Sequence, residues 1–137
     1  MSDLTRTDVI KLIAIATKPL KLSGVNLSGV DLSNLDLSEA NLRGADLSNA
    51  DLSNANLGLA DLRFSLSFDL NLTGAMLLGA NLSNAIFRGA NLTNACLNNA
   101  DFKETDFRDA NLTGVIFLTG MDLSKAKLEG VIGYKKP

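Results

Sequence analysis

The sequence predicts an all-β solenoid that begins with one short helix, and three observations support this prediction. Residues 45–57 read ADLSNADLSNANL, a five-residue motif that recurs along most of the chain. Large and small apolar residues alternate at fixed places in the motif, and turn-forming residues follow them. A different pattern occupies residues 5–17, before the first repeat. Internal repeats of constant length indicate a stack of identical structural units.

The central residue of each repeat, position i, defines the reading frame. It falls at Leu22 and then at every fifth residue to Phe117, and after one extra residue the frame resumes at Leu123 and Leu128. Of these 22 centres, seventeen are Leu and four are Phe, and Ser67 is the exception. Position i−2 is Ala in thirteen repeats, and position i−1 is Asn or Asp in fifteen. Each place in the repeat therefore has its own chemical character.

The period of five describes one short side and one corner of a coil. Positions i−2 and i point to the same side of an extended backbone, and position i−1 points outward. The next inward residue, i+3, lies an odd step further on, so the chain must turn between copies. Ser-Asn and Thr-Gly pairs at i+1 and i+2 suit such a corner. A helix fails as an alternative, because a period of five drifts around its surface.

The repeat resembles the A-(N/D)-L-x-x consensus of the pentapeptide-repeat family over residues 20–131. This resemblance implies a right-handed quadrilateral β-helix with four repeats per coil. The repeats then make about 5–6 coils, a rod about 26 Å long at the spacing of β-ladders. We divide the chain into an N-terminal capping helix at 1–19, the β-helix at 20–131 and a C-terminal tail at 132–137.

The ends of such a rod are open ladders that need a cover. Thr5 and Asp8 form a capping-box-like start of a helix over residues 5–17, and Pro19 stops it. The apolar face of this helix comprises Val9, Leu12, Ile13 and Ala16. At the other end, the apolar residues of 131–134 either cover the last coil or bind a second copy of the chain end to end.

Two irregularities interrupt the frame. Around Ser67, Leu66 and Phe68 take outward positions, and Leu70 replaces the usual Ala at i−2. Three interpretations remain open: Leu70 fills the space that Ser67 leaves, a bulge turns Phe68 inward, or a protruding loop binds a ligand. The second irregularity is the extra residue near 118–121, for which we expect a corner bulge.

The composition lacks the usual groups of catalysis. The chain contains no His, and the single Cys96 has no His to activate it and no second Cys for a disulfide. No phosphate-loop motif is present, and the acids Asp101, Glu104 and Asp106 alternate with basic residues. We therefore expect no enzyme, no cofactor, no metal site and no small-molecule substrate.

Charge and hydropathy limit the partners in the same way. The net charge is −2, so no basic excess indicates direct binding of nucleic acid. No apolar run approaches the length of about 20 residues that a membrane span needs. The first residues do not resemble a signal peptide, and the lone cysteine suits a reducing compartment. We expect a cytoplasmic protein without a membrane partner.

One side of the predicted coil differs from the other three. With four repeats per coil, the side centred on residues 37, 57, 77, 97 and 117 changes from polar to apolar along the rod. Contiguous apolar surface on a soluble rod indicates a binding role. A cover by the helix or the tail is the alternative. The candidate partner surface on this side comprises Leu59, Met76, Leu78, Cys96, Ile116 and Leu118.

These observations favour a non-catalytic scaffold that mediates protein–protein interaction, either with a partner protein or by self-association, including a homodimer. The alternative comes from the resemblance, since some pentapeptide-repeat proteins imitate DNA and bind or protect DNA gyrase. Such mimicry requires strong, continuous negative potential. Residues 20–131 carry thirteen acidic and eight basic residues, a net charge of −5. That charge is modest for a duplex mimic.

Overall fold

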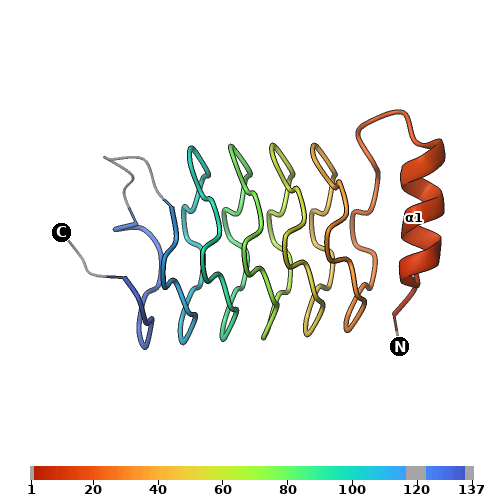
Figure 1. The fold of residues 1–137 in the computed structure, drawn as a ribbon. Helices are drawn as coiled ribbons and strands as arrows, with labels where there is room; N and C mark the ends of the chain where they lie inside the picture. The colour runs from red at the N-terminus through yellow and green to blue at the C-terminus, as the bar shows by residue number, and fades with distance from the viewer. Residues whose placement is uncertain (1, 117–122, 135–137) are drawn as a thin grey trace.

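Parallel β-bridges join outward residues that lie twenty positions apart, from Lys21↔Asn41 to Cys96↔Ile116. The computed structural model describes residues 2–116 and 123–134. Because twenty residues hold four repeats, each coil has four sides, as predicted. The coils stack into a rod with the two termini at opposite ends (Figure 1).

The extra residue changes the register once. Asp106 bridges Lys127 and Asn111 bridges Ile132, so both pairs are twenty-one residues apart. The frame after the extra residue is therefore the one that the sequence predicts. The predicted corner bulge itself falls on residues 118–121, which lie outside the described part of the chain. The ladder ends at Ile132, while Val131 and Tyr134 pack, partly buried, against the core.

The core is a column of side chains from positions i and i−2. The Leu and Phe centres from Leu22 to Leu112 are buried, and the small Ala residues fill the space between them. Phe87 and Phe107 lie on one side in consecutive coils, and their rings stack with centroids 5.7 Å apart. Backbone N–H groups donate to carbonyl groups of the next coil, for example Leu22 N–H to Asn41 O at 2.8 Å. The narrow core thus explains the alternation of large and small residues.

Ser67 stays in the coil. Its side chain is fully buried beside Ser65, with the two hydroxyl oxygens 3.3 Å apart, and Leu70 is fully buried as well. Phe68 remains outside, with 38% of its surface exposed. The interpretation in which a bulge turns Phe68 inward is therefore wrong, and so is the protruding loop. The remaining interpretation, compensation by Leu70, agrees with the burial of both residues.

The helix α1 (Arg6–Ile15) lies across the N-terminal end of the rod (Figure 1). Its capping box is present, because Asp8 N–H donates to the Thr5 hydroxyl and Thr5 N–H donates to the Asp8 carboxylate. Val9 is fully buried against the first coil. Ala16 does not belong to the buried face: it is the C-cap, extended and exposed, because the chain turns there toward the coil.

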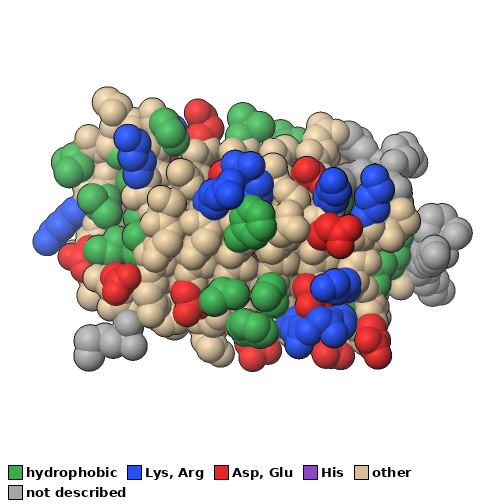
Figure 2. All heavy atoms as spheres, turned by 180° about the vertical axis from the view of Figure 1, so that it is seen from behind, with side chains coloured by type: hydrophobic (Ala, Val, Ile, Leu, Met, Phe, Trp, Pro, Cys, Tyr) green, Lys and Arg blue, Asp and Glu red, His purple; other side chains and the backbone are tan. Residues whose placement is uncertain are grey.

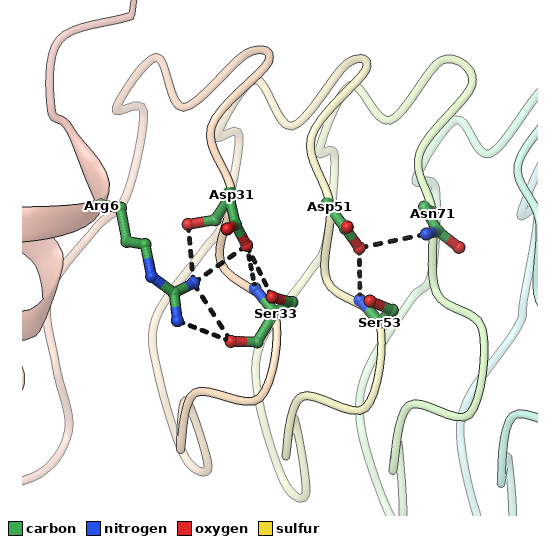
Figure 3. Close-up of polar contacts among 6 residues, drawn as sticks. All are labelled: Arg6, Asp31, Ser33, Asp51, Ser53 and Asn71. Carbon is green, nitrogen blue, oxygen red and sulfur yellow. Dashed lines mark hydrogen bonds and ion pairs between the residues drawn. The ribbon is translucent and has the colours of Figure 1, made fainter.

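Polar contacts fasten this end to the first coil. The guanidinium of Arg6 donates to the Asp31 carboxylate at 2.9 Å and to the carbonyl of Ser33 at 3.1 Å (Figure 3). Asp3 N–H donates to Asn26 O at 2.7 Å, and Asn26 N–H donates to the Asp3 carboxylate at 2.8 Å. These bonds occupy backbone groups that an open ladder would leave unpaired.

Candidate functional site

The outward Asn and Asp residues at position i−1 have a local structural role. Their side-chain oxygen accepts a hydrogen bond from the backbone N–H two residues later, which closes an Asx turn at the corner. Asp51 accepts from Ser53 N–H at 2.9 Å in this way, and Asn71 donates its amide to Asp51 in the neighbouring coil (Figure 3). Where an apolar residue occupies i−1, the corner loses this bond.

The corners also require left-handed backbone. Position i+2 has φ between 53° and 72° at corners along the rod, and Gly, Asn, Asp or Glu occupies most of them. Leu59 (φ 58°) and Phe64 (φ 60°) are the bulky exceptions. Any residue with a Cβ is unfavourable in this region, because the Cβ approaches the following carbonyl oxygen. Asn and Asp offset that cost by local hydrogen bonds, which Leu and Phe cannot make. Two consecutive corners therefore carry residues that the local backbone disfavours.

The fourth side of the rod holds an apolar surface, which we call the Met76 strip. It comprises Leu59, Met76, Leu78, Cys96 and Ile116. Bridges join Met76 to Cys96 and Cys96 to Ile116, so these three side chains lie in register along the rod. Leu59, Met76, Leu78 and Ile116 expose 67%, 50%, 51% and 54% of their surface, and Cys96 is half-buried.

Part of the Met76 strip forms a shallow groove. Leu59, Met76 and Leu78 line it, and its volume is about 320 Å³. The rest of its lining comes from Ser38, Glu39, Asn56 and Gly58. Leu59 lies over Gly79 in the next coil, since a Cβ on Gly79 would be 2.8 Å from Leu59 Cδ2. Leu118, the sixth residue of the predicted surface, lies outside the described residues. The helix covers the end of the rod rather than this side.

Ionised side chains flank the N-terminal end of this strip. Lys18 pairs with Asp36 at 3.2 Å and donates to the hydroxyl of Ser38. The hydroxyl and the backbone N–H of Ser38 donate to Asp36 and hold the pKa of that carboxyl below its usual value. Polar residues thus bound the groove on the side toward α1.

Two acidic side chains elsewhere on the rod, Asp61 and Asp106, have basic partners. Asp61 pairs with Arg63 at 2.6 Å, and the hydrogen bonds from this guanidinium lower the pKa of Asp61. Asp106, with its side chain only 8% exposed, pairs with both Arg88 and Arg108. In residues 2–116 and 123–134, no group of three His, Cys, Asp or Glu residues could hold a metal ion. These pairs interrupt any continuous negative stripe.

A second apolar surface lies on the second side of the rod and its corner, and the sequence analysis did not assemble it. We call it the Phe64 strip, and it comprises Phe64, Leu66, Phe68 and Ile86. Leu66 and Ile86 are bridged in consecutive coils. The signal was available, because these two residues occupy i−1 positions twenty residues apart. Leu66 was interpreted only as part of a local irregularity, and Ile86 was not considered with it.

Together, the geometry defines a four-sided repeat rod whose outward side chains form two exposed apolar strips. The chain belongs to the family described as Pentapeptide repeats, which matches in eight copies over residues 21–63, 68–103 and 98–130. The fold is the right-handed quadrilateral β-helix of that family. A search of the curated proteins found no match.

Several solved structures resemble the rod. A pentapeptide repeat protein, Rfr23, from the cyanobacterium Cyanothece 51142 is 29% identical over 81% of this chain and 85% of its own, with a TM-score of 0.69. HetL from Nostoc sp. strain PCC 7120, involved in heterocyst differentiation regulation, is 29% identical over 82% of this chain and 46% of its own, with a TM-score of 0.44. The Nostoc protein alr5209 is 27% identical over 93% of both chains, with a TM-score of 0.43.

The structure also bears on the expectation about membranes. Within the part of the chain that it describes, no helix has the length and apolar character to cross a bilayer.

Proposed function

We propose that this chain is a non-catalytic scaffold that binds a partner protein through the Met76 strip. The observation that carries the proposal is the alignment of Met76, Cys96 and Ile116 in one ladder, with three of the strip's larger side chains gathered around a groove. Half-exposed apolar side chains in register offer a partner a continuous contact surface.

The cost that these apolar residues impose on local stability supports a role in binding rather than in folding. Met76, Cys96 and Ile116 stand where Asn or Asp would close an Asx turn, and Leu59 stands where a left-handed residue would suit the backbone. Each apolar residue therefore weakens its own corner. Residues that cost local stability and remain exposed are typical of binding surfaces.

The ion pairs on the rod favour a scaffold over duplex mimicry. The pairs of Asp61 with Arg63 and of Asp106 with two arginines place positive charge beside the acids. A DNA mimic needs uninterrupted negative potential along the rod.

The test compares the native chain with Met76→Asn/Ile116→Asn as bait in lysate of the source organism. Asn is the residue that this repeat uses at i−1, so the variant keeps the fold. We expect a partner that the native chain captures and the variant loses. Capture of the same proteins by both baits would contradict the proposal, and so would capture of none.

Light scattering of the two chains examines self-association. A native dimer that the double variant converts to a monomer would identify a second copy as the occupant of the Met76 strip. Leu66→Asn/Ile86→Asn is the matched control, because it makes the same chemical change on the opposite side of the rod.

A further inference from the structure

The Phe64 strip is a second exposed surface, on the side of the rod opposite the Met76 strip. Phe64, Leu66 and Phe68 expose 48%, 41% and 38% of their surface, and Ile86 is half-buried. The second and fourth sides of a four-sided coil face in opposite directions. Any ligand of the Phe64 strip is therefore separate from a ligand of the Met76 strip.

The residues of this strip destabilise the corners of the coil at which they lie. Leu66 and Ile86 occupy i−1 positions and provide no side-chain oxygen for an Asx turn, whereas Asp46 in the preceding coil accepts from Ser48 N–H at 3.0 Å. Phe64 occupies a left-handed corner with φ of 60°. Burial in the core does not offset these costs, because the side chains point outward.

Charged side chains of both signs lie at the ends of the strip: Asp46 and Asp106 continue its ladder beyond Leu66 and Ile86, and basic side chains lie close by. At the N-terminal end, the guanidinium of Arg43 lies 4.8 Å from the centre of the Phe64 ring. At the C-terminal end, Ile86 lines a groove of about 370 Å³ with Arg88, Arg108 and Lys127. Figure 2 shows hydrophobic side chains at the middle of one face and a dense group of charged side chains toward its C-terminal end.

The balance of charge in this groove is positive. Its lining contains three basic residues and two acids, Glu104 and Asp106. The Asp106 carboxylate already pairs with two arginines, at 2.9 Å and 2.7 Å. Among the described residues, Arg43 and Lys127 take part in no ion pair within 4.0 Å. Lys127 is therefore available to a carboxylate from outside, whereas Arg43 lies over Phe64 and also lowers the pKa of Asp61 through its charge.

The backbone limits how a partner can bind. Along this side, N–H and C=O groups pair between coils, for example Leu66 N–H with Ala45 O at 2.9 Å and Ser67 N–H with Ile86 O at 2.8 Å. A partner cannot add a strand there and must dock through side chains. The coils repeat at about 4.8 Å, close to the 5.4 Å pitch of an α-helix. An extended segment repeats at about 6.8 Å and fits less well.

We propose that the Phe64 strip binds an acidic amphipathic helix of a partner protein. Apolar side chains at i and i+3 or i+4 of that helix contact Leu66, Ile86 and the two phenylalanines. Its carboxylates lie beyond this apolar contact, toward Lys127. This proposal does not depend on the function of the Met76 strip.

The probe is a displayed library of random peptides of about 16 residues, long enough for four helical turns. The library is first depleted on Leu66→Asn/Ile86→Asn and then selected on the native chain. We expect enriched peptides with net negative charge and apolar residues spaced by three or four. Absence of enrichment would overturn the proposal, as would enrichment of basic or unpatterned sequences.

Binding of an enriched peptide is then measured by fluorescence anisotropy. We expect Leu66→Asn/Ile86→Asn to weaken the affinity by about tenfold or more. Lys127→Glu should weaken it several-fold, and about 0.5 M salt should reduce that difference. The control Met76→Asn/Ile116→Asn should leave it within about twofold. An equal loss in this control would overturn the proposal. So would a native dimer in light scattering that only Leu66→Asn/Ile86→Asn dissociates.

Discussion

At the residue scale, the identity of each outward side chain decides how well its corner is stabilised. Asn and Asp at i−1 accept the N–H of residue i+1, as Asp51 does from Ser53. Residues at i+2 adopt left-handed backbone, which Gly and Asn tolerate better than other residues. Leu59 and Phe64 depart from this rule on adjacent corners. Both residues belong to the apolar strips, so the departures coincide with the candidate binding surfaces.

Leu59→Asn should stabilise the chain by about 1 kcal/mol, because Asn tolerates left-handed backbone and Leu59 buries little surface. The urea midpoint measures this gain. The reverse change, Asn49→Leu, is the control at an ordinary corner and should lower the midpoint. A lower midpoint for Leu59→Asn would show that the contact of Leu59 over Gly79 outweighs the backbone cost.

The carboxyl groups of Asp31, Asp36 and Asp61 should make stability fall in acid. Hydrogen bonds from Ser33, Ser38 and Arg63 lower their pKa values in the folded chain. Stability from a lowered pKa is complete above the unfolded pKa of about 3.9 and is lost as the pH falls through the folded pKa.

The triple variant Asp31→Asn/Asp36→Asn/Asp61→Asn keeps an acceptor for the Asx turns but removes the titration. Its urea midpoint should therefore change less than that of the native chain between pH 6 and pH 2, a range that spans the usual pKa of Asp. Parallel profiles for the two chains would contradict the assignment of acid sensitivity to these three groups.

At the element scale, one coil of the rod is a closed layer of core side chains. The buried Leu and Phe residues from Leu22 to Leu112 fill the centres. Ser67 fills less volume than a Leu would, and the buried Leu70 can fill the remaining space from the adjoining side. The helix α1 closes the first layer with Val9 and ties it to the coil through Arg6. The stability of the fold thus depends on filling each layer and on covering the open end of the rod.

Leu70→Ala should lower the free energy of unfolding by about 2–5 kcal/mol, because it opens a cavity in a fully buried layer. Leu66→Ala is the exposed control and should cost less than about 1.5 kcal/mol. Adding Ser67→Leu to Leu70→Ala restores the usual pattern of the repeat and should recover part of the loss. Purely additive losses in urea unfolding would show that Leu70 does not compensate for Ser67.

The coil could be predicted from sequence because its information is local. The recurrence of Leu, Ala and a turn pair defines side, corner and register, and Thr5 with Asp8 marks the start of the helix. The placement of Met76 and Ile116 followed from the same register. Whether Ser67 stays in the coil depends on how the neighbouring side chains pack around it. A repeat pattern carries no information about that packing. The alignment of Leu66 with Ile86 was readable from the same register, whereas the contact of Arg43 with the Phe64 ring depends on side-chain conformation.

At the scale of the whole molecule, the rod presents two apolar strips on opposite sides of the same coils. The Met76 strip is bounded by polar residues toward α1, and the Phe64 strip has both basic and acidic residues at its ends. The stacked layers between the strips form one continuous core. Such an arrangement can hold two different ligands at a constant separation, which is the advantage of a stiff repeat rod over a flexible linker.

The quadruple variant Leu66→Asn/Met76→Asn/Ile86→Asn/Ile116→Asn tests whether the strips exist for binding or for folding. Each Asn can restore an Asx turn with a net gain of about 0.5–1.5 kcal/mol. Each change also removes apolar contact between neighbouring coils of about 0.2–1 kcal/mol. We therefore expect a urea midpoint at or above that of the native chain, with both binding activities lost.

Asn71→Leu is the control in the opposite direction: it removes an Asx turn from the polar third side, which should lower the midpoint. A quadruple variant that is less stable than the native chain by more than about 2 kcal/mol would mean that the apolar residues support the fold, because losses of that size come from packing rather than from free surface.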